Sequence, residues 1–146
     1  MERKQVILVT NAITSNEILE VKKALVGAPE RSNLEIKLNL VHIIPRLPTC
    51  YFNIPSMLML VEKYYEEAKQ YLTHVGEILE VQKQDQWLLA GKIRSEVLRL
   101  AKKTDAHFIL ASSQYIQELQ QSPDFQKTQD FTLLNIMGPL TSLNRA

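Results

Sequence analysis

Residues 87–113 read WLLAGKIRSEVLRLAKKTDAHFILASS. Trp87–Ala90 is a short apolar run that ends at Gly91, and His107–Ala111 is a second apolar run. Between the two runs, apolar residues recur at helical spacing over Lys92–Lys103. The segment therefore predicts a strand, a glycine turn, a helix and a second strand. Parallel strands require a helical crossover of this kind, so the pattern favours a parallel α/β sheet.

The composition is that of an ordinary globular protein. The 146 residues are 45% hydrophobic and 23% charged, and the formal net charge is +1. This length fits one domain, residues 1–146. A charge so close to zero gives no electrostatic reason to expect nucleic acid or an anionic membrane as a partner. A single cysteine, no run of 18 apolar residues and no signal-peptide pattern lead us to expect a cytoplasmic protein.

Strands and helices alternate along the first part of the chain. Val6–Thr10 (VILVT) is apolar at odd and even positions alike, which is typical of a central parallel strand covered on both faces. Thr14 and Glu17 have the spacing of a capping box at the start of a first helix. Leu34–Ile44 predicts a second strand, and the three prolines within residues 45–55 predict a connector without regular structure.

The longest predicted helix spans Met57–Leu79, with Ser56 as its N-cap. Its apolar residues form a broad stripe, with steps of four and three residues through Met57, Val61, Tyr64, Ala68, Tyr71, Val75 and Ile78, widened by Leu58, Tyr65, Leu72 and Leu79. A coiled coil has such a pattern. In an alternation of strands and helices, however, a broad stripe more often packs on a sheet, which is the interpretation we favour.

The last part of the chain predicts two more strands around a short helix. Lys83–Ala90 begins with the polar residues KQDQ, so we place this strand at a sheet edge. Ser113–Gln121 predicts a short helix, Ser122–Asp130 a loop or frayed helix, and Phe131–Met137 the final strand. The order βαβαβαβαβ predicts a doubly wound α/β sandwich.

Taken in this order, the segments resemble the universal stress protein A family over nearly the whole chain. The matching pieces are VILVT with the Ser/Thr turn after it, LEIKLNLVHII, the long helix with EEAKQYL, AGKIRSEVLRLAKKTDAHFILASS and the terminal LLNIMGPL. The resemblance implies a three-layer, Rossmann-like sandwich of the adenine nucleotide alpha-hydrolase type. Its five-stranded parallel sheet would have the strand order 3-2-1-4-5.

The resemblance also implies a homodimer in which the last strands of two copies pair. An apolar edge strand is an aggregation hazard unless something covers it, so such pairing is physically reasonable. The residues expected at this interface are Leu133, Leu134, Ile136 and Met137. The alternative is that the protein's own tail, Leu140–Ala146, covers the strand.

One branch of the family binds ATP, through an aspartate after the first strand and a glycine-rich loop after the fourth. Backbone N–H groups reach phosphate oxygens only where side chains leave room. Here Asn11 stands at the position of the aspartate, and no glycine occurs between Lys92 and Met137. We therefore expect the branch that lacks the loop, without a cofactor. Weak binding of ATP or AMP in a degenerate pocket is the alternative.

A residual pocket of this kind would lie at the carboxyl ends of the first and fourth strands, where open α/β sheets bind ligands. In the implied strand order, Asn11, Val41, Ser112 and Ser113 would line it. Asn11 would then hydrogen-bond an adenine or ribose edge, unless it merely caps a turn.

The other chemistry-bearing residues predict neither a catalytic nor a metal site. Cys50 has no His or acidic neighbour in the sequence, and Ser112–Ser113 lacks a G-x-S-x-G elbow. The three histidines lack the spacing of zinc ligands, and we expect two of them to be satisfied sheet residues: His42 and His107.

We therefore expect a protein that is not an enzyme and that acts in the stress response through its dimer surfaces and protein partners. A nucleotide-responsive regulator is the alternative. The connector adds an open question, because Cys50, Tyr51 and Phe52 could form a lid over the pocket, an interaction patch or part of the core edge.

Overall fold

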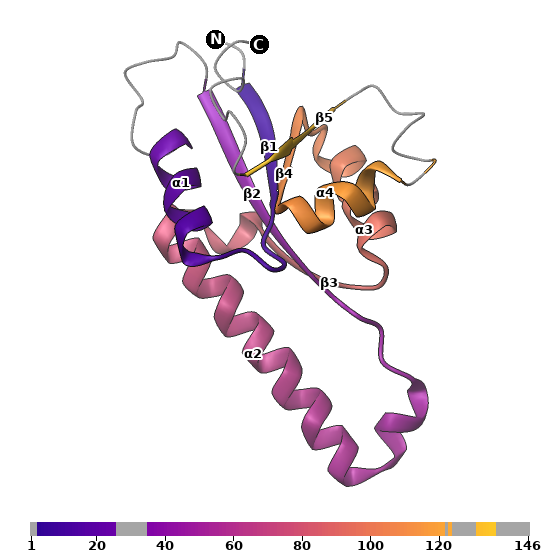
Figure 1. Ribbon diagram of the computed structural model, residues 1–146. Helices are drawn as coiled ribbons and strands as arrows, with labels where there is room; N and C mark the ends of the chain where they lie inside the picture. The colour runs from indigo at the N-terminus through magenta and orange to yellow at the C-terminus, as the bar shows by residue number, and fades with distance from the viewer. Residues whose placement is uncertain (1–2, 26–34, 122, 124–130, 137–146) are drawn as a thin grey trace.

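The computed structural model describes residues 3–25, 35–121, 123 and 131–136. Within them, one sheet contains the strands β1 Arg3–Val9, β2 Glu35–Ile44, β3 Gln86–Ala90, β4 Phe108–Ala111 and β5 Thr132–Asn135 (Figure 1). All neighbouring strands are parallel, in the order β3-β2-β1-β4-β5. This confirms the predicted Rossmann-like sheet with the order 3-2-1-4-5.

Helices cover both faces of the sheet, which makes the sandwich three layers thick (Figure 1). They are α1 Ser15–Leu25, α2 Pro55–Leu79, α3 Ile93–Thr104 and α4 Ser113–Gln120. Val6 and Leu8 pack with α1 and α2, whereas Ile7 and Val9 pack with α3 and α4. All four side chains are 0% exposed, as a central strand covered on both faces requires. None of the described helices has the length and apolar character needed to cross a membrane.

The predicted start of α1 is confirmed, and that of α2 is wrong. Thr14 N–H donates to Glu17 Oε1 at 3.0 Å and Glu17 N–H donates to Thr14 Oγ1 at 3.2 Å, which completes the capping box. α2, in contrast, begins at Pro55, before Ser56, and its N-cap Ile54 makes no side-chain hydrogen bond. A proline suits the first helical position because the N–H that it lacks would have no partner there.

Short 3₁₀ helices replace parts of two other predicted segments. The connector contains η2 Thr49–Asn53, so it is not wholly irregular. Lys83–Asp85 forms η3, so β3 starts only at Gln86. The edge position of β3 is confirmed, but most of the polar residues that suggested it precede the strand. Apart from Pro123, the predicted loop Ser122–Asp130 lies outside the described residues.

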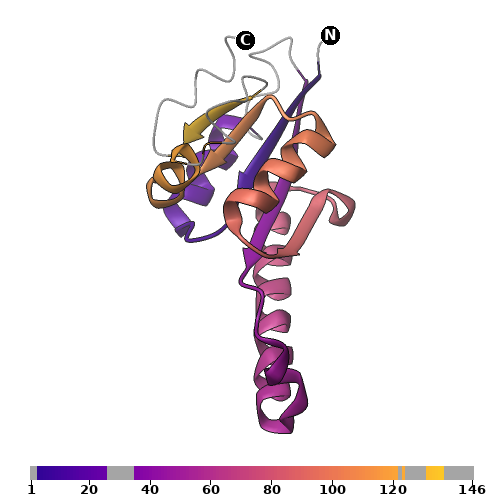
Figure 2. The same ribbon diagram turned by 90° about the vertical axis from the view of Figure 1, so that its right-hand side faces the viewer.

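The first half of α2 extends beyond the body of the protein (Figure 1), and Figure 2 shows the same projection from the side. We call residues 45–67, which comprise the connector and this half of the helix, the arm; within it, η2 packs against α2. In the other half of α2, Leu72, Val75 and Leu79 are at most 4% exposed and belong to the core. In the arm, Tyr64 and Tyr65 of the same stripe are 42% and 37% exposed. The prediction that the stripe packs on the sheet thus holds for the second half of the helix alone.

Candidate functional site

At the carboxyl end of β1, a side chain continues the pairing with β2. The β1–β2 ladder ends with Val9 opposite Val41. Beyond it, Asn11 Nδ2 donates to the Ile43 carbonyl at 2.7 Å, and Ile43 N–H donates to Asn11 Oδ1 at 2.9 Å. These two bonds fix the orientation of the Asn11 amide and fasten the β1–α1 turn to β2. The sequence predicted a ligand contact or a turn cap at this position and did not predict this role.

A second polar cluster lies next to this turn. Thr10 Oγ1 donates to the Val41 carbonyl at 3.1 Å and lies 2.9 Å from His42 Nδ1. The Tyr71 hydroxyl donates to the carbonyls of Thr10 and Ile13, at 3.2 and 3.3 Å. The rings of His42 and Tyr71 meet edge to face, with 5.4 Å between their centroids. His42 is therefore the satisfied sheet histidine that the sequence predicts.

Burial governs the protonation of this cluster. It lowers the pKa of His42, which is therefore neutral at pH 7. Burial also raises the pKa of Tyr71, and the charge of Glu17 raises it further. Both rings are thus uncharged near neutral pH, and they can contact apolar groups without desolvating a charge.

A pocket of about 390 Å³ opens beside this cluster, where α2 leaves the sheet. We call it the base pocket, because it lies at the base of the arm; its lining residues are Ala12, Ile13, His42, Tyr64, Glu67, Ala68 and Tyr71. The sequence did not predict it, because Tyr64, Ala68 and Tyr71 were assigned to the apolar stripe. The one sign in the sequence is that Tyr64 and Tyr71, seven residues apart, each carry a hydroxyl group, which a fully buried apolar stripe does not require.

Of the four residues of the predicted residual pocket, Asn11, Ser112 and Ser113 follow the carboxyl ends of β1 and β4, whereas Val41 lies within β2. Val41 is 0% exposed in the core beneath α3 and α4, so its side chain faces no ligand. Ser113 Oγ accepts a hydrogen bond from Asn135 Nδ2 at 2.7 Å. Ser112 is 6% exposed, and its Oγ has no hydrogen-bond partner within the described part of the chain. Of these polar side chains, only that of Ser112 makes no bond inside the described chain.

The connection between β4 and α4 is short and contains no glycine. Ser112 is its only residue, and the Ser112 carbonyl accepts from the N–H groups of Tyr115 and Ile116 at 3.0 and 2.9 Å. These two bonds close the first turn of α4 and occupy the N–H groups of Tyr115 and Ile116. Among the described residues, no group of three or more His, Cys, Asp or Glu could hold a metal ion.

Two of the four predicted dimer residues, Leu133 and Leu134, lie on the outermost strand of the described sheet. β5 pairs with β4 at one edge of the sheet, and Leu133 and Leu134 are half-buried on its opposite faces. Ile136 is 1% exposed and belongs to the core of a single chain, so its side chain offers no further surface to a partner. Met137 and the tail Leu140–Ala146 lie outside the described residues.

Comparison with known proteins supports the fold. No family model matches this chain, and no curated protein matches it either. Among solved structures, the crystal structure of the hypothetical protein PH0823 is similar, with a TM-score of 0.53 and 15% sequence identity. The similarity covers 93% of this chain and 98% of that one. At this level of identity it shows a shared fold and says nothing about activity.

Proposed function

We propose that this chain is a non-catalytic protein of the universal stress protein type, which acts in the cytoplasm as a homodimer and binds protein partners. The observation that carries the proposal is the bonding of polar residues within the chain just beyond the carboxyl ends of β1 and β4. Asn11 is bonded to Ile43, Ser113 is bonded to Asn135, and a single residue joins β4 to α4. With these side chains bonded within the chain, we expect the protein to act through its surfaces.

The outer edge of β5 is the surface that we assign to the homodimer. β5 is the outermost strand of the described sheet, and strands at sheet edges associate readily. Leu133 and Leu134 are partly exposed on either side of it. Two copies related by a twofold axis would continue the sheet from one protomer into the next.

Titration calorimetry with ATP tests the absence of a phosphate cradle. We expect no binding in the micromolar range, and no nucleotide released when the purified protein is denatured and its absorbance at 260 nm is read. ATP binding at micromolar or tighter affinity, held by main-chain amides near Gln114, would overturn the proposal.

Ser112 supports a second candidate function, a nucleotide-responsive regulator. Its buried Oγ lies at the carboxyl end of β4 and has no partner in the described chain. Without a phosphate cradle, such a site would bind adenosine, AMP and ATP with the same affinity, and Ser112→Ala would weaken all three. An affinity that rises with the number of phosphates would exclude this form of the regulator.

Survival after growth arrest tests the role in the stress response. We expect a strain that lacks the gene to survive poorly and the wild-type chain to restore survival. Equal survival of the deletion and parent strains under several stresses would contradict this role, whatever the nucleotide titrations show.

A further inference from the structure

The arm carries nearly all the large apolar side chains that the described chain exposes. Exposed fractions range from 37% for Tyr65 to 70% for Met59, and the six residues are Phe52, Ile54, Met59, Leu60, Tyr64 and Tyr65. Outside the arm, Leu19 is the only large apolar residue of the described chain that is exposed to a similar degree. Scattered apolar residues are normal on a surface, but a concentration of this kind marks an interaction site.

The base pocket has the form of a socket for a side chain from another helix. The four of its lining residues that come from α2 are Tyr64, Glu67, Ala68 and Tyr71. Their spacing is i, i+3, i+4 and i+7, which is the set of four residues that forms a hole for a knob in helix–helix packing. Since the described residues of the chain leave this hole open, an exposed apolar side chain on a neighbouring helix can enter it.

Leu60 is such a knob. It is 66% exposed and lies four residues before Tyr64, one turn closer to the tip of the arm. A helix cannot place its own Leu60 in a hole that begins at Tyr64 on the same helix. A second copy of the helix, running antiparallel, can place its Leu60 in this hole. Under twofold symmetry, Leu60 of each copy then fills the hole of the other copy.

We propose that two copies of this chain associate through antiparallel arms, with Leu60 of each copy inserted in the base pocket of the other. The twofold axis passes near Tyr64, so the Tyr64 rings of the two copies face each other. This association is separate from the β5 edge and does not rest on the proposed function.

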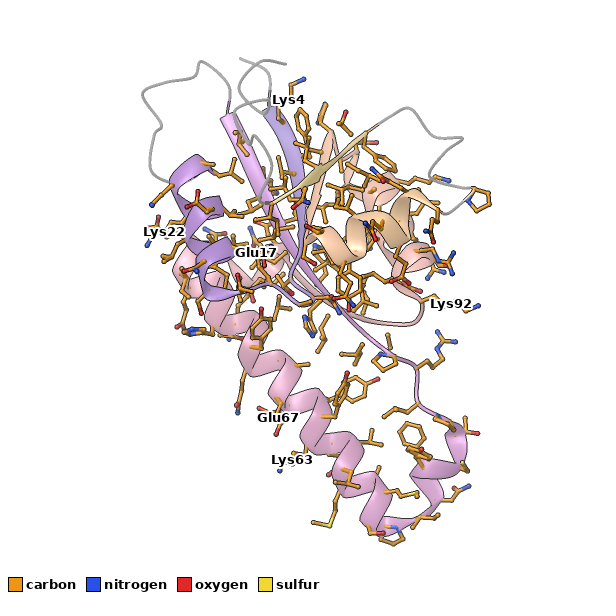
Figure 3. The ribbon with its side chains drawn as sticks, in the orientation of Figure 1. Lys4, Glu17, Lys22, Lys63, Glu67 and Lys92 are labelled. Atoms are coloured by element: carbon orange, nitrogen blue, oxygen red, sulfur yellow. The ribbon has the colours of Figure 1, made fainter. Side chains whose placement is uncertain are left out.

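The charges of the arm suit a second copy. Its charged residues are Arg46 and Lys63 against Glu62, Glu66 and Glu67, a mixture that selects neither an acidic nor a basic partner. Lys63 and Glu67 already form an exposed pair at 4.0 Å on the part of α2 that leaves the sheet (Figure 3). In the antiparallel arrangement, Lys63 of one copy comes within about one helical turn of Glu66 and Glu67 of the other.

Two of the exposed apolar side chains of α2 lie on the face that the second copy covers. At about 100° per residue along a helix, Leu60 and Tyr64 lie about 40° apart on the face of the base pocket, whereas Met59 and Tyr65 lie about 100° beyond them on either side. A standard interface covers about 800 Å² on each partner, and the flanking polar residues add to the apolar part.

Sedimentation equilibrium of Leu60→Glu tests the proposal. The substitution places a charge in each socket, and we expect arm association to weaken by roughly 100-fold or more, because each dimer loses two anchors. Leu19→Glu is the matched control, since it adds the same charge at an exposed leucine on α1 and should leave association unchanged. Leu60 is exposed in a single chain, so L60E should keep the unfolding midpoint of the wild type.

The outcomes separate the arm from the β5 edge. If L60E associates more weakly than the wild type, and the double variant L60E/L134K more weakly than L134K, the result supports association through the arm. The proposal is overturned if L134K no longer associates while L60E and L19E associate as strongly as the wild type. It is also overturned if the wild-type chain is monomeric up to roughly 100 µM.

A nitroxide on Cys50 gives an independent measurement. Cys50 is the only cysteine of the chain and is exposed near the tip of the arm. Tips that lie at opposite ends of an antiparallel pair are roughly 25–30 Å apart at 1.5 Å of rise per residue. We expect a dipolar distance in this range that disappears in L60E. The absence of such a distance in the associated wild type would contradict the antiparallel arrangement.

Discussion

Asn11 shows how one amide decides the chemistry of its surroundings. It gives Ile43 both a donor and an acceptor, whereas the aspartate of the ATP-binding branch could only accept. Asn11→Asp would set a carboxylate against the Ile43 carbonyl. We expect a loss of about 1–3 kcal/mol in the free energy of unfolding, measured with urea at neutral pH. Asn16→Asp, in the exposed first turn of α1, is the control and should change stability by less than about 0.5 kcal/mol. Equal effects of the two variants would show that the Asn11 bonds contribute nothing.

His42 makes stability depend on pH. Burial lowers its pKa below the ordinary value of 6.5, so the unfolded chain takes up this proton at a higher pH than the native chain does. The free energy of unfolding therefore falls as the pH drops through 6.5 and below. His42→Gln keeps a hydrogen-bonding group beside Thr10 but does not titrate. We expect the wild type to lose more stability than H42Q between about pH 7.5 and about pH 5.5, as measured by urea unfolding. Parallel pH profiles would exclude a contribution from His42.

At the scale of elements, the β3–α3 turn depends on Gly91. Its φ is +149°, which side chains rarely adopt, and its N–H donates to the Ile44 carbonyl at 2.9 Å. A Cβ at this position would lie 2.9 Å from Glu96 Oε1. We expect Gly91→Ala to lower the free energy of unfolding by about 1–3 kcal/mol in urea. Ser95→Ala, at an exposed position in the first turn of α3, is the control and should match or exceed the wild type in stability.

At the scale of the whole molecule, the β5 edge and the arm are separate surfaces. β5 lies at one edge of the sheet, and β1 and β4 separate it from β2, which leads into the arm. We expect Leu134→Lys to halve the mass measured by light scattering, because a charge at a half-buried edge position opposes strand pairing. Leu134→Met should keep the mass of the wild type. An unchanged mass of L134K would favour a strand covered by its own tail.

The elements and their order could be predicted because their signals are local. Three local signals are confirmed. VILVT is apolar at odd and even positions and is buried on both faces of the sheet, Thr14 and Glu17 form the capping box, and Gly91 forms the turn after β3. Topological rules for parallel sheets also place Asn11 and Ser112 at the carboxyl ends of their strands. The hydrogen bonds of Asn11 and Ser113 could not be predicted. Asn11 bonds a residue 32 positions away, and Ser113 bonds one that is 22 positions away.

By itself, the sequence determined which residues of α2 form its apolar stripe, because helical periodicity is a property of the chain alone. It did not determine what that stripe contacts. Leu72 and Val75 pack on the sheet, whereas Tyr64 and Tyr65 extend past it and stay exposed. Only the tertiary structure decided this, because the position at which the sheet ends beneath the helix depends on how strands from distant parts of the chain come together.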